Sequence, residues 1–252
     1  AMAIHDFNAQ RLWLDSPLRE GGEVAVTREQ SNYLRNVLRL NDGDAILVFN
    51  GRDGEWRAHM AALGKRDAVL RVESLMRPQS APGRLVYLFA PLKRARLDYM
   101  VQKAVEMGAG RLAPVLTRRT VAERVNLERM RANAIEAAEQ CGILAIPEID
   151  EPQRLEARLD GWPAEVPLIF CDESAPNTNP VDALAELGAR MSWPSQVGVL
   201  IGPEGGFDET ERGMLLRQPF VTALSLGPRI MRADTAAVAA LALVNAMLGD
   251  WR

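Results

Sequence analysis

The feature that most constrains the fold is an alternation that begins at residue 85. From there to the end of the chain, short apolar runs alternate with helical segments. Strands are predicted at 85–90, 111–116, 168–172, 197–201 and 221–225, and helices at 95–107, 127–141, 181–189, 208–216 and from 234 onward. Strands separated by helices pair in parallel, with helices on both faces of the sheet. The sequence therefore predicts an α/β domain with a mostly parallel sheet.

The first 75 residues follow a different pattern. Short strands are predicted at 11–14, 23–26, 45–50, 55–62 and 68–75, separated by turns rich in Asn, Asp and Gly. One helix is predicted at 28–39, where Tyr33, Leu34, Val37 and Leu38 recur at helical spacing. This combination predicts a small β-barrel domain.

Residues 76–84 contain two prolines and a glycine with almost no apolar content, which is typical of a linker between domains. We therefore predict two domains, 1–78 and 79–252. A chain of 252 residues with 48% hydrophobic residues is long enough to bury a core in each.

Two glycine–proline loops mark the predicted ligand site. Residues 202–206 read Gly-Pro-Glu-Gly-Gly and residues 226–236 read Leu-Gly-Pro-Arg-Ile-Met-Arg-Ala-Asp-Thr-Ala. Each loop follows a predicted strand, and open α/β sheets bind ligands at the carboxyl ends of their strands. Glycine lets the backbone approach a flat ligand, and proline stiffens the turn. Either loop alone also fits an ordinary strand-to-helix turn; the two together favour a binding site.

The net charge of −3 hides a basic central segment. Residues 76–131 hold 12 basic and 4 acidic side chains. Arg118 and Arg119 directly follow a predicted strand, which places them beside the presumed site. A basic patch in an acidic protein indicates a polyanionic partner such as RNA, and the alternative is a solvated helix face.

Other classes of protein lack support in the sequence. The longest apolar helix candidate, 235–248, falls short of the roughly 20 residues that a bilayer requires, so no membrane partner is expected. His5, His59 and two scattered cysteines form no metal-ligand spacing, so we expect no metal. Neither a Walker loop nor a dinucleotide fingerprint occurs. Cys141 and Cys171 form no disulfide framework and no secretion signal opens the chain, which favours a cytoplasmic location.

These motifs, taken in order, resemble those of the RsmE family, the 16S ribosomal RNA uridine-N3 methyltransferases of the SPOUT superfamily. The resemblance covers nearly the whole chain. Besides the two loops it includes Val37-Leu38-Arg39-Leu40, Gln102-Lys103-Ala104-Val105-Glu106-Met107-Gly108, Pro114 with Arg118-Arg119, Glu139-Gln140-Cys141-Gly142 and Pro147-Glu148-Ile149. Two positions depart from the family pattern: Asp234 stands where the family usually has glutamate, and Ile143 where it has a basic residue.

The resemblance implies a SPOUT-type, trefoil-knotted, mostly parallel sheet flanked by helices, with an N-terminal PUA-like β-barrel. It also implies a homodimer that binds S-adenosylmethionine in the knot and acts on 16S rRNA or the small ribosomal subunit. Carried onto this sequence, the cofactor-binding residues are Phe170, Glu173, Ile201, Gly202, Pro203, Glu204, Gly205, Leu226, Gly227, Arg229, Ile230 and Met231.

Methyl transfer to uracil N3 requires alignment of donor and acceptor and removal of one proton. Arg229 or Arg232 is the candidate for stabilising the resulting anion, and Asp234 or Glu204 for accepting the proton. Asp234 is equally compatible with a helix-capping role. The predicted RNA contacts are Arg11, Arg28, Arg35 and Arg39 in the first domain and Lys93, Arg94, Arg118 and Arg119 in the second.

Two other functions fit parts of the sequence. The barrel and the basic segment also suit an RNA-binding or ribosome-assembly factor without activity, although such a factor has no need of Gly202, Gly205, Gly227 and Arg229. A tRNA methyltransferase of the same superfamily is the second alternative, and many of those enzymes lack the barrel.

Overall fold

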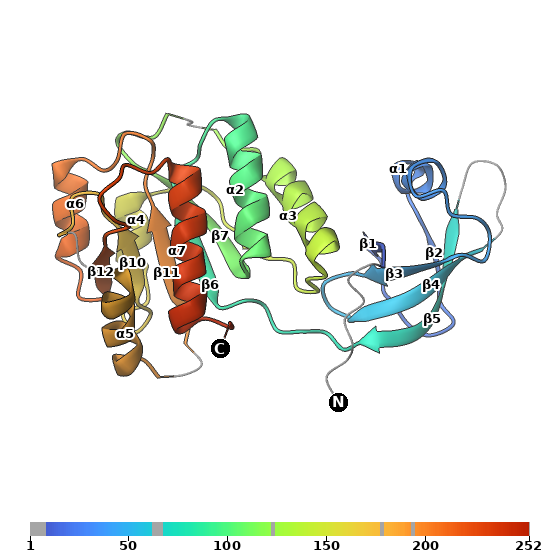
Figure 1. Cartoon of the computed structure of the whole chain (residues 1–252). Helices are drawn as coiled ribbons and strands as arrows, with labels where there is room; N and C mark the ends of the chain where they lie inside the picture. Colours follow the sequence, from blue (N-terminus) through green and yellow to red (C-terminus); the bar gives the residue numbers. More distant parts are fainter. Residues whose placement is uncertain (1–8, 62–67, 122–123, 177–178, 193–194, 252) are drawn as a thin grey trace. The chain divides into compact units, whose positions relative to one another are not determined.

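The chain forms two compact units (Figure 1). The computed structural model describes residues 9–61, 68–121, 124–176, 179–192 and 195–251. One unit comprises Ala1–Ala81 with Ile135–Ile146, and the other comprises Pro82–Ala134 with Pro147–Arg252. Helix α3 (Leu127–Cys141) therefore supplies residues to both units.

The first unit is built on a curled five-stranded sheet. Its strand order is β1 (Arg11–Trp13), β3 (Ala45–Phe49), β4 (Glu55–Ala61), β5 (Val69–Arg77) and β2 (Glu23–Ala25). Strand β1 pairs with β3 in parallel, and the other pairs are antiparallel. Among the described residues the two edge strands do not pair with each other, so this sheet is a half-barrel rather than the closed barrel that the sequence predicted. Its core contains Leu34, Val48 and Leu70.

The helix predicted at 28–39 is confirmed at its start, and it changes from an α-helix to a π-helix after residue 32. Helix α1 (Arg28–Asn32) begins with a capping box between Thr27 and Gln30, and it continues as the π-helical turn η1 (Tyr33–Val37). The Leu38 N–H donates to the Tyr33 carbonyl at 2.9 Å, the wider spacing of a π-helix. Arg39 then takes a left-handed φ of 57°, which ends the helix.

The second unit contains a seven-stranded sheet in which every recorded pair is parallel, as predicted. Its main path runs β12 (Val221–Leu224), β10 (Leu168–Cys171), β11 (Val197–Ile201), β6 (Leu85–Phe89), β7 (Ala109–Leu116) and β8 (Glu148–Ile149). Strand β9 (Gln153–Arg154) also pairs with β7. The short strands β8 and β9 were not predicted, because two residues are too few to show a periodicity.

Helices cover both faces of this sheet (Figure 1). On one face lie α2 (Arg94–Glu106), α5 (Pro180–Arg190) and α7 (Ala233–Leu248). On the other lie α4 (Leu155–Asp160) and α6 (Glu209–Leu216), whose leucines pack against Val86 and Leu88 of β6. Because both faces are covered, all five residues of β6 are buried.

The helix ends follow their sequences. Asp208 and Glu211 form the capping box of α6 that the sequence predicted. No helix in the described part of the chain has the length and apolar character needed to cross a bilayer.

Candidate active site at the carboxyl edge of the sheet

The three predicted cofactor loops follow three neighbouring strands. Because β12, β10 and β11 are adjacent and parallel, the loops that begin at residues 225, 172 and 202 leave the same edge of the sheet. The loops after β6 and β7 leave that edge too. The structure therefore brings the glycine–proline segments together with the basic segment at 117–121.

The loop after β11 is fitted closely around its glycines. A Cβ at Gly202 would lie 2.6 Å from the Phe207 ring, which meets the Phe170 ring edge-on with centroids 5.0 Å apart. Phe170 is fully buried, so its ring supports this loop from the core and does not line an open pocket. Ile201 and Pro203 are also buried, whereas Glu204 and Gly205 are exposed.

The loops after β10 and β11 touch. Gly206 has a left-handed φ of 68°, and a Cβ there would lie 2.6 Å from Glu173 Oε1. Any larger residue at 206 would have to displace that carboxylate. Asp172, just before it, is buried and accepts a hydrogen bond from Arg212 Nε at 3.0 Å, which fixes the start of the loop to α6.

The thiol of Cys171 lies at the end of β10, and its enclosure raises its pKa to about 12. A thiol with so high a pKa stays protonated at neutral pH and is a poor nucleophile.

The loop after β12 is the most open of the three. Gly227 has φ of 101°, and a Cβ there would meet nothing within 4 Å, so the loop borders free space. Arg229 and Arg232 are exposed, and among the described residues neither side chain has a recorded hydrogen bond or ion pair. Ile230 is 92% exposed, which leaves a large apolar side chain without a covering surface.

Asp234 and Glu204, the two carboxylate candidates, have different surroundings. Asp234 is the second residue of α7 and not its N-cap, which is Arg232 without a side-chain cap bond; the helix-capping alternative survives only as a contact within the first turn. Its Oδ1 accepts a hydrogen bond from the Thr235 N–H at 2.9 Å. Glu204 Oε1 instead faces Arg96 Nη1 of α2 at 3.4 Å.

Buried Tyr87 of β6 lies close enough to Asp234 to feel its charge. Its pKa is raised well above the usual range, mainly by burial and further by Cys171 and Asp234.

Arg118 and Arg119 tie the loop after β7 to the loop after β11. Arg118 donates through its backbone N–H to Glu211 Oε1 and through Nη1 to Asp208 Oδ2, both at 2.8 Å. These contacts to Asp208 raise the pKa of Arg118. Arg119 Nη1 donates to the Gly205 carbonyl at 2.7 Å. Both guanidinium groups, predicted to contact RNA, are thus bonded to the predicted cofactor loop after β11 and to the N-cap of α6.

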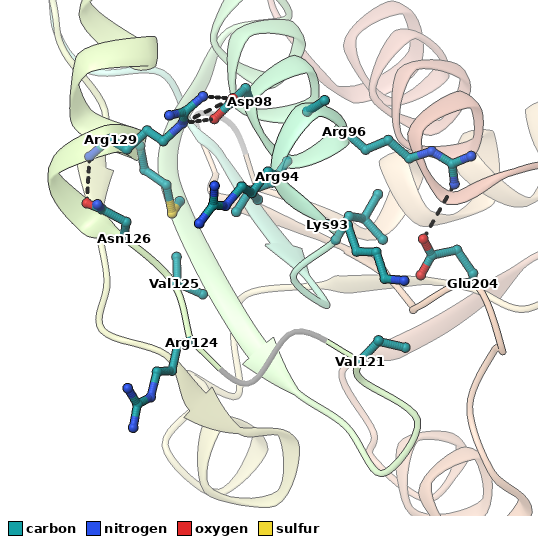
Figure 2. A pocket seen from close by; sticks show the side chains of 14 residues that line it. Lys93, Arg94, Arg96, Asp98, Val121, Arg124, Val125, Asn126, Arg129 and Glu204 are labelled. Carbon is teal, nitrogen blue, oxygen red and sulfur yellow. Dashed lines mark hydrogen bonds and ion pairs between the residues drawn. The ribbon is translucent and has the colours of Figure 1, made fainter.

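Beside these loops lies a cavity of about 1400 Å³, here called the basic cleft (Figure 2). It is formed by the first turns of α2 and α3, by residues 92–93, 121 and 124–126, and by Glu204. The residues that line it are Leu92, Lys93, Arg94, Ala95, Arg96, Leu97, Asp98, Val121, Arg124, Val125, Asn126, Arg129, Met130 and Glu204. Glu204 therefore belongs both to a predicted cofactor loop and to this cleft.

The charges in the basic cleft are only partly balanced. Arg129 forms a bidentate pair with Asp98, with Nη2 to Oδ2 at 2.6 Å, and this pairing lowers the pKa of Asp98. Arg96 pairs with Glu204. Lys93, Arg94 and Arg124 have no recorded ion pair in the described part of the chain. The RNA-contact prediction for Lys93 and Arg94 thus falls on cations without a recorded ion pair. Arg124 belongs to the basic segment of the sequence but was not among the predicted RNA contacts, and it lines the same cleft.

In the first unit the four predicted arginines have different positions. Arg11 is buried and its Nε donates to Glu55 Oε2 at 2.9 Å, so we assign it a structural role in the half-barrel and correct the expectation of an RNA contact. Arg28 and Arg39 are exposed. Arg35 is half-buried, and two of its guanidinium nitrogens are buried without a hydrogen-bond partner in the described residues.

The part of the chain that the structure describes contains no group of three or more His, Cys, Asp or Glu side chains placed to hold an ion. His59 contacts the Gly43 carbonyl and Glu73, and His5 lies outside the described residues.

Comparison with known families agrees with this arrangement. Residues 79–245 match the family model described as an RNA methyltransferase domain, and residues 26–73 match an RNA methyltransferase PUA domain. Fold and site together define the class: an RNA methyltransferase with a PUA domain at its N-terminal end.

Individual relatives give the particular family. A ribosomal RNA small subunit methyltransferase E from Rickettsia conorii is 28% identical over 95% of this chain and 96% of its own length. The enzyme of that name from Synechocystis sp. is 30% identical over 89% of this chain and 73% of its own length. The Neisseria gonorrhoeae enzyme, solved bound to S-adenosylmethionine, aligns with a TM-score of 0.80 at 25% identity, covering 97% of this chain and all of its own. The chain belongs to the ribosomal RNA small subunit methyltransferase E family.

Proposed function

We propose that this protein transfers the methyl group of S-adenosylmethionine to N3 of a specific uridine in 16S ribosomal RNA. The proposal rests on two features that lie at the same edge of the parallel sheet and share one residue, Glu204. One is the set of glycine-containing loops after β12, β10 and β11, and the other is the basic cleft. A methyl donor held by the loops would lie beside an RNA strand held by the cations. The relatives' names supply the substrate class.

The residues at the three loops fit the cofactor. Gly227 opens onto free space, and Leu226 and Met231 are partly exposed beside it, which provides an apolar surface for the adenine. Glu173 and Gly205 supply polar groups on the neighbouring loops. When bound, S-adenosylmethionine supplies an electrophilic methyl group. The protein's contribution is to aim the target N3 at that carbon and to exclude water.

Proton removal is assigned to Asp234. Uracil N3 carries a proton that must leave, and the resulting anion spreads onto two carbonyl oxygens. The Asp234 carboxylate has no cationic partner recorded among the described residues, whereas Glu204 is engaged by Arg96. Arg229 and Arg232, both exposed and without a recorded ion pair in the described residues, would stabilise the carbonyl oxygens as they gain charge.

Three further parts of the proposal come from the family. The chain of the second unit threads into a trefoil knot around the cofactor loops. Two copies form a homodimer in which the second subunit completes the RNA-facing cleft, and the protein works in the cytoplasm.

We propose domain limits of 1–78 and 79–252 for the PUA-like and SPOUT parts. Exposed Arg28 and Arg39, with Arg35, hold RNA on the first domain.

The deciding experiment is methylation of small ribosomal subunits, and separately of free 16S rRNA, taken from a strain that lacks the protein. Mass mapping of the product should show one added methyl group on N3 of a single uridine. Calorimetric titration with S-adenosylmethionine separates this proposal from a ribosome-assembly factor without activity, which would not bind the cofactor. A product found on tRNA and not on 16S rRNA would replace the substrate assignment.

A further inference from the structure

The basic cleft has two kinds of wall. Leu92, Leu97, Val121, Val125 and Met130 give it an apolar side. Val121 is 63% exposed, so part of this apolar side faces open space. The rest of the lining is mostly cationic. An apolar wall beside a cationic rim matches the chemistry of a nucleotide, whose base has an apolar face and whose phosphate is an anion.

The cations without a recorded ion pair in the described residues lie at separate positions along the cleft. Lys93 and Arg94 come from the start of α2, and Arg124 from the segment before α3, so they approach the cleft from two sides (Figure 2). Asp98 and Glu204, the acidic lining residues, already face Arg129 and Arg96. Among the described lining residues, the net charge is therefore carried by these three side chains, and both acidic groups already face a cation.

We propose that the basic cleft is a subsite for a nucleotide of the RNA substrate that flanks the methylated uridine. The base packs on Val125, and successive phosphates of the bound strand contact Lys93, Arg94 and Arg124 at their separate positions along the cleft (Figure 2). The subsite rests on the proposed function, because Glu204 joins the cleft to a cofactor loop and so sets the bound nucleotide beside the one that reacts. A protein partner is less well matched, since three unpaired cations favour a polyanion.

The test measures binding of the full-length protein to unmethylated small ribosomal subunits over a range of salt concentrations. For Arg124→Ala we expect a several-fold weaker affinity and a log affinity–log salt slope that is smaller by roughly 0.7 to 1, the value for one lost phosphate contact. For Val125→Ser we expect weaker affinity with an unchanged slope, because a stacking contact releases no counterion. Arg190→Ala removes the same charge from α5, outside the cleft lining, and should change neither quantity.

Two results would overturn the subsite. One is wild-type affinity and slope for Arg124→Ala and Val125→Ser. The other is a change in sedimentation mass for these variants with RNA binding intact, which would show that a second copy of the chain covers the cleft. Cofactor binding and methylation by the wild-type protein are measured in the same preparation. If the wild-type protein fails to bind the cofactor or to methylate the RNA, the proposed function is rejected. If it succeeds and the variants bind RNA as the wild type does, only the subsite is rejected.

Discussion

At the residue scale, Asp234 is the side chain whose chemistry bears most directly on the reaction. It sits in the first turn of α7 without serving as the cap, and its charge reaches Tyr87 in the sheet below. Its Oδ1 accepts the Thr235 N–H, and the carboxylate has no recorded cationic partner in the described residues, so its other oxygen is available to a substrate proton. The same position gives it a favourable interaction with the helix N-terminus.

Replacing Asp234 by Asn separates these two contributions. The amide keeps the shape and loses the base, so we expect kcat to fall by about 10²- to 10⁴-fold. Thermal stability should change little, because a charge near a helix N-terminus contributes only about 0.3–1 kcal/mol. Single-turnover methylation and a melting curve measure the two effects. Unchanged turnover would remove Asp234 from the mechanism and return the role to Glu204.

Glu139 allows a prediction about pH. It lies on α3 within the first unit and accepts a hydrogen bond from the Trp13 N–H at 2.8 Å. Burial raises its pKa, with the neighbouring charge of Glu136 adding to the effect. The carboxyl thus holds its proton more tightly in the folded chain than in the unfolded one. Its contribution to stability is complete below the unfolded pKa and is lost as the pH rises through the folded value.

Glu139→Gln should therefore stabilise the protein at neutral pH. The amide oxygen still accepts the Trp13 N–H, and no charge is buried. We expect the Tm at pH 7.5 to rise by about 2–4 °C for each kcal/mol recovered, and the gain should shrink as the pH is lowered toward 5. Calorimetry at both pH values measures it. A gain that grows on acidification would show that the carboxylate is stabilising instead.

At the scale of elements, hydrogen bonds from the loop after β7 hold the loop after β11 and the start of α6. Arg119 reaches the Gly205 carbonyl, and Arg118 reaches Asp208 and Glu211. Glu211 is 1% exposed and also completes the capping box of α6. The conformation of the cofactor loop thus depends on a segment that is not its neighbour in sequence.

Arg119→Ala should remove the hydrogen bond to the Gly205 carbonyl and so loosen the loop after β11. Because the lost hydrogen bond is exposed, we expect a modest effect, a fall of about 3- to 10-fold in affinity for S-adenosylmethionine. The salt slope of RNA binding should stay the same, since the guanidinium is bonded to protein. Calorimetric titration and the salt series measure the two quantities, and Arg119→Lys, which keeps the charge, serves as the control. An unchanged cofactor affinity with a reduced slope would make Arg119 an RNA ligand.

Gly202 tests how tightly the same loop is packed. A Cβ would lie 2.6 Å from the Phe207 ring, and that ring is held edge-on against buried Phe170. Gly202→Ala should therefore destabilise the protein by about 1–3 kcal/mol, the usual cost of overpacking. Urea unfolding measures the loss. Gly21→Ala, with open space around its Cβ but a left-handed φ of 73°, reports the cost of backbone strain alone.

The sequence predicted the elements well where periodicity was strong. The strands of the parallel sheet and the capping box of α6 follow from apolar runs and from Asp208 with Glu211. The change from α-helix to π-helix at Tyr33 was not predictable, because the five residues of η1 are too few for apolar spacing to distinguish the two forms. The ion pairs were not predictable either. Arg11 and Arg28 look alike in the sequence, and only the fold places Glu55 beside Arg11.

At the scale of the whole molecule, the division into two units gives a distinct thermodynamic expectation. The proposed cofactor loops belong entirely to the second unit. A ligand stabilises only the part that binds it, by about 2.7 kcal/mol at 100 times its Kd. In calorimetry, saturating S-adenosylmethionine should raise the Tm of one transition and leave the other in place. A single transition that shifts as a whole would show that the units unfold together.

The parallel sheet also has a consequence for biosynthesis. Strand β6 pairs with β11, and the partners are separated by about 110 residues of chain. At a synthesis rate of about 5–20 residues per second, the β6 edge stays unpaired for roughly 5–20 seconds. During that time the nascent polypeptide displays five apolar residues with open backbone groups. Recognition of that stretch by chaperones at the exit tunnel would be a direct outcome of its strand order.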